Sequence, residues 1–126
     1  MYEVTVAARF EAAHRLVGDF GPATRAHGHT YRLEVTVRGD TLAGDGALID
    51  IGALRPAVDE IAAALHYRDL TEVPGLSSLN TTAEHIARHC WRQLAPALQG
   101  RGLSSLRVVV WESDDAGAAL DASLDP

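Results

Sequence analysis

The sequence predicts an α+β fold, with a mainly antiparallel four-stranded sheet and two helices on one face. Apolar and polar side chains alternate in two segments near the N-terminus, which is the period of a strand with one buried face. Apolar residues then recur at helical spacing in the middle of the chain, and a β-branched segment follows near its end. Strands followed by helices and then by strands again are typical of α+β proteins.

The first two strands are predicted at 2–10 and 31–38, where every second residue is apolar. Residues 18–26, between them, contain glycine, proline and small side chains and are predicted to form a loop. A second loop, 39–46, leads into the short apolar segment 47–50.

The two helices are predicted from their apolar faces, which consist of Leu54, Val58, Ile61 and Leu65 in the first, and Ile86, Cys90, Leu94 and Leu98 in the second. Pro56 is compatible with a first helical turn. The sequence Thr81-Thr82-Ala83-Glu84 has the form of a capping box and predicts the start of the second helix. The last strands are predicted at 106–112 and 115–124, and residues 121–126 are expected to fray.

Composition excludes several classes of function. At 126 residues we expect one domain, 1–126. The net charge of −6, without a basic stripe that has interleaved aromatic residues, argues against nucleic acid as a partner. No segment resembles a signal peptide or a membrane span, and the single cysteine, Cys90, suits a reducing compartment, so we expect a cytoplasmic protein with no membrane partner. Four strands cannot close a barrel and would leave long edges exposed, which predicts a homo-oligomer assembled edge to edge.

Three histidines carry most of the functional information. His27 and His29 form a His-x-His pair next to an alternating segment, which places both imidazoles on one face of a strand. His14 follows the first strand and can supply a third imidazole from a neighbouring strand end. Three nitrogen ligands with a fourth position open for water or substrate are typical of catalytic zinc sites, so Zn²⁺ is the predicted cofactor.

Two alternatives involve histidine motifs. His85 and His89 are four residues apart on the second predicted helix, but the glutamate of a helical metalloprotease motif is absent, which favours a solvated helix face. Gly21, the His-x-His pair and Glu34 also resemble the first metal motif of cupins. Strand alternation places Glu34 on the opposite face from His29, and two long helices do not suit a jelly roll.

The whole chain resembles the 6-pyruvoyl-tetrahydropterin synthase and 6-carboxy-tetrahydropterin synthase family. The resemblance rests on Phe10-Glu11-Ala12-Ala13-His14, His27-Gly28-His29-Thr30-Tyr31, Leu48-Ile49-Asp50-Ile51, Asn80-Thr81-Thr82-Ala83-Glu84 and Val110-Trp111-Glu112-Ser113. It implies the tunnelling fold, in which three subunits form a barrel and two trimers stack as a hexamer. It also implies that the three histidines bind zinc, that Glu112 anchors a pterin ring, and that the substrate is 7,8-dihydroneopterin triphosphate.

The sequence departs from this family in its acid and base residues. The family's proton-transfer cysteine corresponds to Ala23, which has no thiol. The family's Asp-His pair corresponds to His66 and Tyr67, and both of these side chains can serve as general acids or bases. They are the candidate catalytic residues, although they could equally pack at a helix end. Arg25 is a candidate for binding a substrate phosphate or stabilising an oxyanion.

We therefore expect a zinc-dependent lyase that acts on 7,8-dihydroneopterin triphosphate or a close relative, with a substituted acid and base set. Two alternatives stay open. One is a diverged enzyme that acts on another heterocycle, and the other is a zinc- and pterin-binding protein without turnover.

Overall fold

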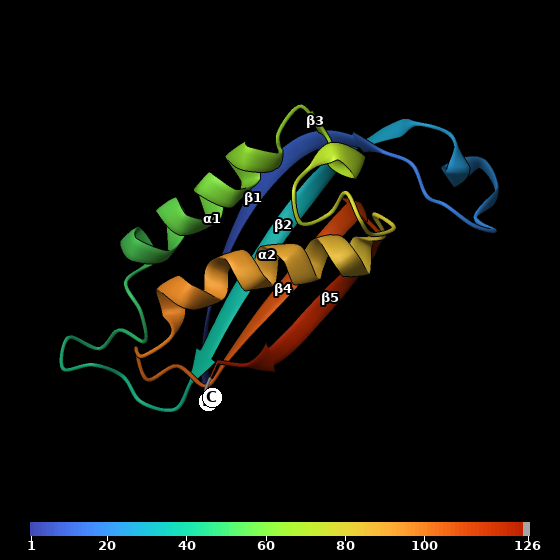
Figure 1. Ribbon diagram of the computed structural model, residues 1–126. Helices are drawn as coiled ribbons and strands as arrows, with labels where there is room; N and C mark the ends of the chain where they lie inside the picture. The colour runs from blue at the N-terminus through green and yellow to red at the C-terminus, as the bar shows by residue number, and fades with distance from the viewer. Residues whose placement is uncertain (125–126) are drawn as a thin grey trace.

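A computed structural model describes residues 1–124 as one five-stranded sheet with two helices across one face (Figure 1). The strand order is β3-β1-β2-β4-β5. The elements are β1 (Tyr2–His14), η1 (Gly21–Thr24), β2 (His27–Gly39), α1 (Ile51–Leu65), β3 (Arg68–Asp69), η2 (Leu70–Glu72), α2 (Ala83–Leu98), β4 (Ser105–Ser113) and β5 (Ala116–Ser123). The α+β class is therefore confirmed, and so are the two helices on one face.

The four long strands are antiparallel, as predicted. The structure adds β3, a two-residue strand that pairs in parallel with β1 at Ala12 and Ala13. A strand of two residues leaves no periodic signal in the sequence, so β3 could not be predicted.

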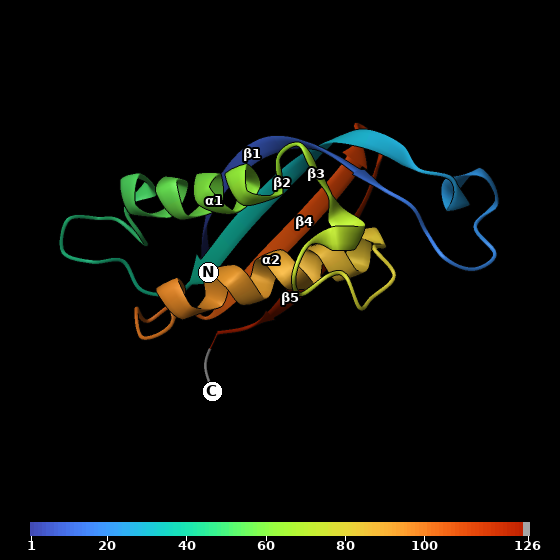
Figure 2. The ribbon, with the colours of Figure 1, turned by 45° about the horizontal axis from the view of Figure 1, so that its top comes forward.

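The β1–β2 hairpin is longer than predicted, because antiparallel pairing continues from Tyr2 opposite Gly39 to His14 opposite His27. The apolar alternation ends earlier, where the strands pass beyond the helices. Figure 2 shows this end of the hairpin and its loop extending away from the body of the molecule.

The core lies between the sheet and the helices, where α1 packs mainly on β1 and α2 on β4 and β5. Phe10 and Tyr31 stack with ring centroids 4.9 Å apart at the edge of this core nearest the hairpin loop. The hydroxyl of Tyr31 is buried and forms no hydrogen bond within residues 1–124. None of the helices in this part of the chain is long and apolar enough to cross a membrane.

Helix starts differ from prediction in two places. Helix α1 begins at Ile51, because the Asp50 side chain accepts a hydrogen bond from the Gly52 amide, and Pro56 therefore lies in the second turn and not the first. The cap of α2 is Thr82 and not Thr81, since the Thr82 hydroxyl accepts a hydrogen bond from the His85 amide.

The expected fraying of 121–126 is wrong for 121–123, because β5 pairs with β4 as far as Ser123. Residues 125 and 126 lie outside the described residues.

Replacing Leu33 with alanine tests the core. Leu33 has no exposed surface, so its truncation should lower the free energy of unfolding by about 2–5 kcal/mol. Leu42→Ala is the matched control, because Leu42 is 36% exposed in a loop and should cost less than about 0.5 kcal/mol. Urea denaturation measures both values, and equal losses would contradict the assigned core.

Candidate metal centre and adjoining cavity

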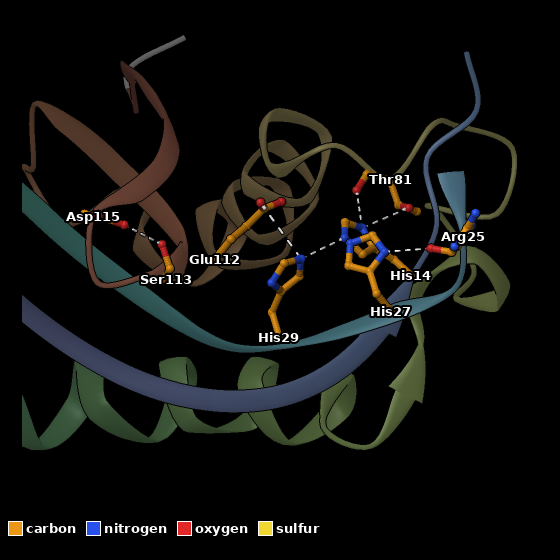
Figure 3. A network of polar contacts seen from close by, with 8 residues as sticks. All are labelled: His14, Arg25, His27, His29, Thr81, Glu112, Ser113 and Asp115. Carbon is orange, nitrogen blue, oxygen red and sulfur yellow. Dashed lines mark hydrogen bonds and ion pairs between the residues drawn. The ribbon is translucent and has the colours of Figure 1, made fainter. Parts of the chain in front are cut away.

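His14, His27 and His29 converge at the end of the β1–β2 hairpin (Figure 3). The register places His14 opposite His27 and Ala12 opposite His29, so all three imidazoles lie on the sheet face that also carries the core. One nitrogen from each ring lies within 4.8 Å of the others. Within residues 1–124 they are the one group of three or more potential ligand residues that could hold a metal ion.

Two backbone carbonyls orient these rings. Nδ1 of His14 lies 2.8 Å from the carbonyl oxygen of Thr81, and Nδ1 of His27 lies 2.7 Å from that of Arg25. Because a carbonyl oxygen only accepts hydrogen bonds, each Nδ1 must carry the proton. The Nε2 lone pairs are thus left free, which is the arrangement that backbone partners give to metal-binding histidines.

Burial favours the neutral form that a ligand requires in His14 and His29. His14 is only 2% exposed, and this desolvation lowers its pKa. The Thr81 carbonyl opposes that shift, while His27 and His29 add to it. Burial likewise lowers the pKa of His29, against the opposing charge of Glu112.

The spacing of the nitrogens suits a tetrahedral ion. Nε2 of His14 and Nε2 of His29 are 3.2 Å apart. Two nitrogens bound tetrahedrally at zinc–nitrogen bond lengths are separated by about 3.3 Å.

Glu112 lies beside the histidines, with its Oε2 atom 4.0 Å from Nε2 of His29 (Figure 3). A β-bulge leaves Glu112 without a partner on β5, since Trp111 pairs with Gly117 and Ser113 pairs with Ala116. The carboxylate accepts no hydrogen bond from residues 1–124. It is therefore available to a ligand.

A cavity of about 390 Å³ adjoins this carboxylate. It is lined by Leu16, Phe20, Thr82, Ala83, Glu84, Glu112, Ala116, Gly117 and Ala118. The cavity thus lies between the start of α2, the β4–β5 turn and the hairpin loop.

Gly117 also borders the opposite face of the sheet, because the indole of Trp111 packs against it there. A β-carbon at position 117 would come within 2.8 Å of both the indole Cε3 atom and the Val110 carbonyl oxygen. Real β-carbons essentially never approach this closely, so glycine is required here. The Arg32 guanidinium stacks over the same indole, 5.8 Å from the ring centroid.

Comparisons with known proteins agree with this geometry. The profile of the 6-pyruvoyl tetrahydropterin synthase family matches residues 3–123. The chain belongs to this family.

Similar proteins are named for different enzymatic activities. A 6-carboxy-5,6,7,8-tetrahydropterin synthase from Haemophilus influenzae is 31% identical over 135 aligned positions, covering 90% of this chain and 94% of the relative. A dihydroneopterin monophosphate aldolase from Pyrococcus furiosus is 30% identical over 114 positions, covering 90% and 92%. The solved 6-pyruvoyl tetrahydropterin synthase of Caenorhabditis elegans has the same fold, with a TM-score of 0.82 at 21% identity, covering 97% of this chain and 96% of that one.

The tetrahydropterin synthase resemblance places the cysteine position at Ala23, which lies in η1. The backbone there is held by hydrogen bonds from the Leu16 amide to the Ala23 carbonyl and from the Ala23 amide to the Phe20 carbonyl. Arg25 follows this turn with its side chain exposed. In Figure 3 the histidines lie between Glu112 on one side and Arg25 on the other.

His66 and Tyr67 lie where α1 ends, and their rings stack with centroids 3.8 Å apart. Nδ1 of His66 accepts a hydrogen bond from the Glu11 amide, and the Tyr67 amide donates one to the Glu11 carbonyl. Tyr67 adopts a positive φ of 58° and is 78% exposed. Within residues 1–124, no hydrogen bond, ion pair or ring contact joins either residue to the three histidines.

Tyr67 nevertheless shares an open cavity of about 600 Å³ with His29. The other residues that line it are Glu11, Ala12, Ala13, Gly28, Thr30, Arg68 and Asp69. The backbone contacts with Glu11 show that His66 and Tyr67 at least secure the edge of the sheet.

Sequence reasoning missed Thr81 and Asn80 as parts of this centre. The Asn80 side chain accepts a hydrogen bond from the Val17 amide and donates one to the Val17 carbonyl, both at 2.9 Å. This clamp holds the hairpin loop against the segment whose Thr81 carbonyl orients His14. The capping-box pattern includes Thr81 but indicated only a helix start, and Asn80 lies just before that pattern.

The cupin alternative fails on geometry. Glu34 points to the opposite face from the histidines and forms ion pairs with Arg32 at 2.9 Å and Arg107 at 4.0 Å.

Proposed function

We propose that the protein is a zinc-dependent lyase acting on 7,8-dihydroneopterin triphosphate or a close relative. The observation that carries this proposal is the convergence of three imidazoles beside a carboxylate that has no hydrogen-bond partner within residues 1–124. Membership of the tetrahydropterin synthase family supports the substrate class.

The three histidines fit zinc in ligand type, number and spacing. His14, His27 and His29 would hold the ion through their Nε2 atoms, which leaves a coordination position for substrate oxygen. When bound, zinc supplies Lewis-acid polarisation of the hydroxyl or carbonyl oxygens of the substrate side chain. The carbonyls of Thr81 and Arg25 hold two of the rings in place throughout.

Glu112 would anchor the pterin ring. An ionised carboxylate accepts two parallel hydrogen bonds from a guanidine-like N–H edge, and such an edge is present in the pterin ring. The cavity of about 390 Å³, which lies between Glu112, the start of α2 and the hairpin loop, gives the ring room. The side chain of the substrate would then extend towards the histidines.

Proton transfer would fall to His66 or Tyr67. Because Nδ1 of His66 accepts from the Glu11 amide, its proton lies on Nε2, and the ring can donate but cannot accept without breaking that bond. The exposed phenol of Tyr67 has no such restriction. Arg25 would bind a phosphate group or developing oxyanion charge.

A cytoplasmic homo-oligomer is the proposed assembly. The outer edge of β5 and the edge of β1 before Ala12 have no partner strand within residues 1–124. The family resemblance supports a trimeric barrel and a hexamer of two trimers.

A second candidate is an aldolase that cleaves a carbon–carbon bond in a dihydroneopterin phosphate. Two observations favour it: the alanine at position 23 and the similarity to the Pyrococcus aldolase over 90% of the chain. Such an enzyme would need no thiol for elimination of triphosphate, and would release a two-carbon aldehyde phosphate instead.

Mass spectrometry of the products tests the function. Zinc-loaded protein incubated with dihydroneopterin triphosphate should eliminate triphosphate from the substrate or shorten its side chain. If the protein is an aldolase, it should instead cleave the side chain of dihydroneopterin monophosphate. Tyr67→Phe should slow turnover more than His66→Ala, because the phenol is the less restricted group. Bound but unchanged substrate would identify a binding protein, and no binding would indicate another heterocycle.

His27→Ala tests the metal centre. Two remaining imidazoles make a poor site, so stoichiometric zinc should be lost from the purified protein, as measured by inductively coupled plasma mass spectrometry. His85→Ala is the matched control and should retain one zinc per chain, because His85 lies on α2 outside the cluster. Retention of zinc by the His27 variant would refute the ligand set.

Glu112→Gln tests the pterin anchor. The substitution removes the negative charge but keeps the size, and it should weaken pterin binding about 10- to 100-fold while zinc content stays unchanged. Ligand fluorescence titration measures the affinity. The control is Glu60→Gln on α1, which should bind as the parent does, and an equal loss there would remove the anchor assignment.

Sedimentation velocity tests the assembly. The expected mass is that of three or six chains, because edge pairing satisfies the backbone groups left open on β1 and β5. A stable monomer at micromolar concentration would contradict the barrel.

A further inference from the structure

Helix α2 carries a basic stripe that the proposed reaction does not use. His85, Arg88, His89 and Arg92 recur at intervals of three and four residues, so they lie along one face of the helix. Together with Gly75, Leu79 and Gln93 they line a cavity of about 170 Å³. We call this set the α2 basic cavity.

The α2 basic cavity contains no compensating acid. None of its lining residues is a carboxylate, and neither Arg88 nor Arg92 forms an ion pair within residues 1–124. Three arginines of the sheet, Arg32, Arg38 and Arg107, differ in that each lies within 4.0 Å of a glutamate. An uncompensated basic group is notable in a chain of net charge −6.

The surrounding backbone shapes the cavity. Gly75 has a φ of +91°, and a β-carbon there would lie 3.1 Å from Nδ1 of His89, so the loop packs closely against this ring. Nδ1 of His85 lies 2.7 Å from the Asn80 carbonyl oxygen and carries the proton. In this tautomer the Nε2 atom of His85 is an acceptor, so the strongest donors of the cavity are the guanidinium groups of Arg88 and Arg92.

We propose that the α2 basic cavity binds a phosphate group, either inorganic phosphate or the phosphate of a small metabolite. Guanidinium groups bind phosphate through two parallel charge-assisted hydrogen bonds, and a cavity of this size suits one such group. A metal ion fits the site less well, because it offers two imidazoles and no carboxylate beside two guanidinium charges. This proposal does not depend on the proposed lyase function.

Nuclear magnetic resonance of the zinc-loaded protein tests the site. Titration with inorganic phosphate should shift the amide signals of Gly75 and of residues 85–92. A parallel titration with adenosine monophosphate distinguishes the two sources of the group, since tighter binding of the nucleotide indicates a metabolite site. Both outcomes support a phosphate site.

Two double variants identify the residues that bind. Arg88→Gln with Arg92→Gln should weaken phosphate binding by about tenfold or more, because both guanidinium donors are lost. Arg55→Gln with Arg101→Gln changes the net charge equally but lies outside the cavity, and it should bind as the parent does. Unchanged circular dichroism confirms that each variant is folded.

Several results would overturn the proposal. Shifts confined to residues around His14, Arg25 and Glu112 would assign the anion to the metal centre. Equal weakening in both double variants would show a general charge effect. A second zinc equivalent that is lost in His89→Ala would identify a metal site instead.

Discussion

The antiparallel pairing of β1 with β2 is the constraint on which the candidate centre depends. Each strand contributes thirteen residues, and the pairing is continuous from the first pair to the last, so the positions of His14, His27 and His29 are fixed by register and not by a flexible loop. A slip of one residue would move a whole strand's side chains to the other face. Strongly apolar residues such as Phe10 and Tyr31 oppose such a slip, because they would lose their place in the core.

The segment at the start of α2 also fixes the geometry of the candidate centre. Three consecutive residues have separate roles there: Asn80 clamps the Val17 backbone, the Thr81 carbonyl orients His14, and the Thr82 hydroxyl caps the helix. The buried imidazole would be costly without a partner for its proton, so the carbonyl stabilises the fold and also fixes the orientation of the ring. The segment 80–82 therefore contributes both to the stability of the fold and to the geometry of the candidate centre.

Much of the fold could be predicted because it depends on periodicity. The alternation in β1 and β2 also indicated correctly that His27 and His29 share a face. What escaped prediction depends on single contacts between distant segments: the two-residue strand β3, the clamp of Asn80 on Val17, and the cap at Thr82 in place of Thr81. The bulge at Glu112 also leaves no periodic trace, although it frees that carboxylate from pairing. Such contacts follow from tertiary packing and not from local pattern.

The indole of Trp111 and the missing side chain of Gly117 link the two faces of the sheet. Trp111 lies flat on one face, while its neighbour Glu112 borders the cavity on the other, and Gly117 lines that cavity. A methyl group at position 117 would displace the indole and with it the backbone that carries the carboxylate. The position of the Glu112 carboxylate can thus be altered from the opposite face of the sheet, which gives natural variation or protein engineering an indirect means of reshaping the cavity.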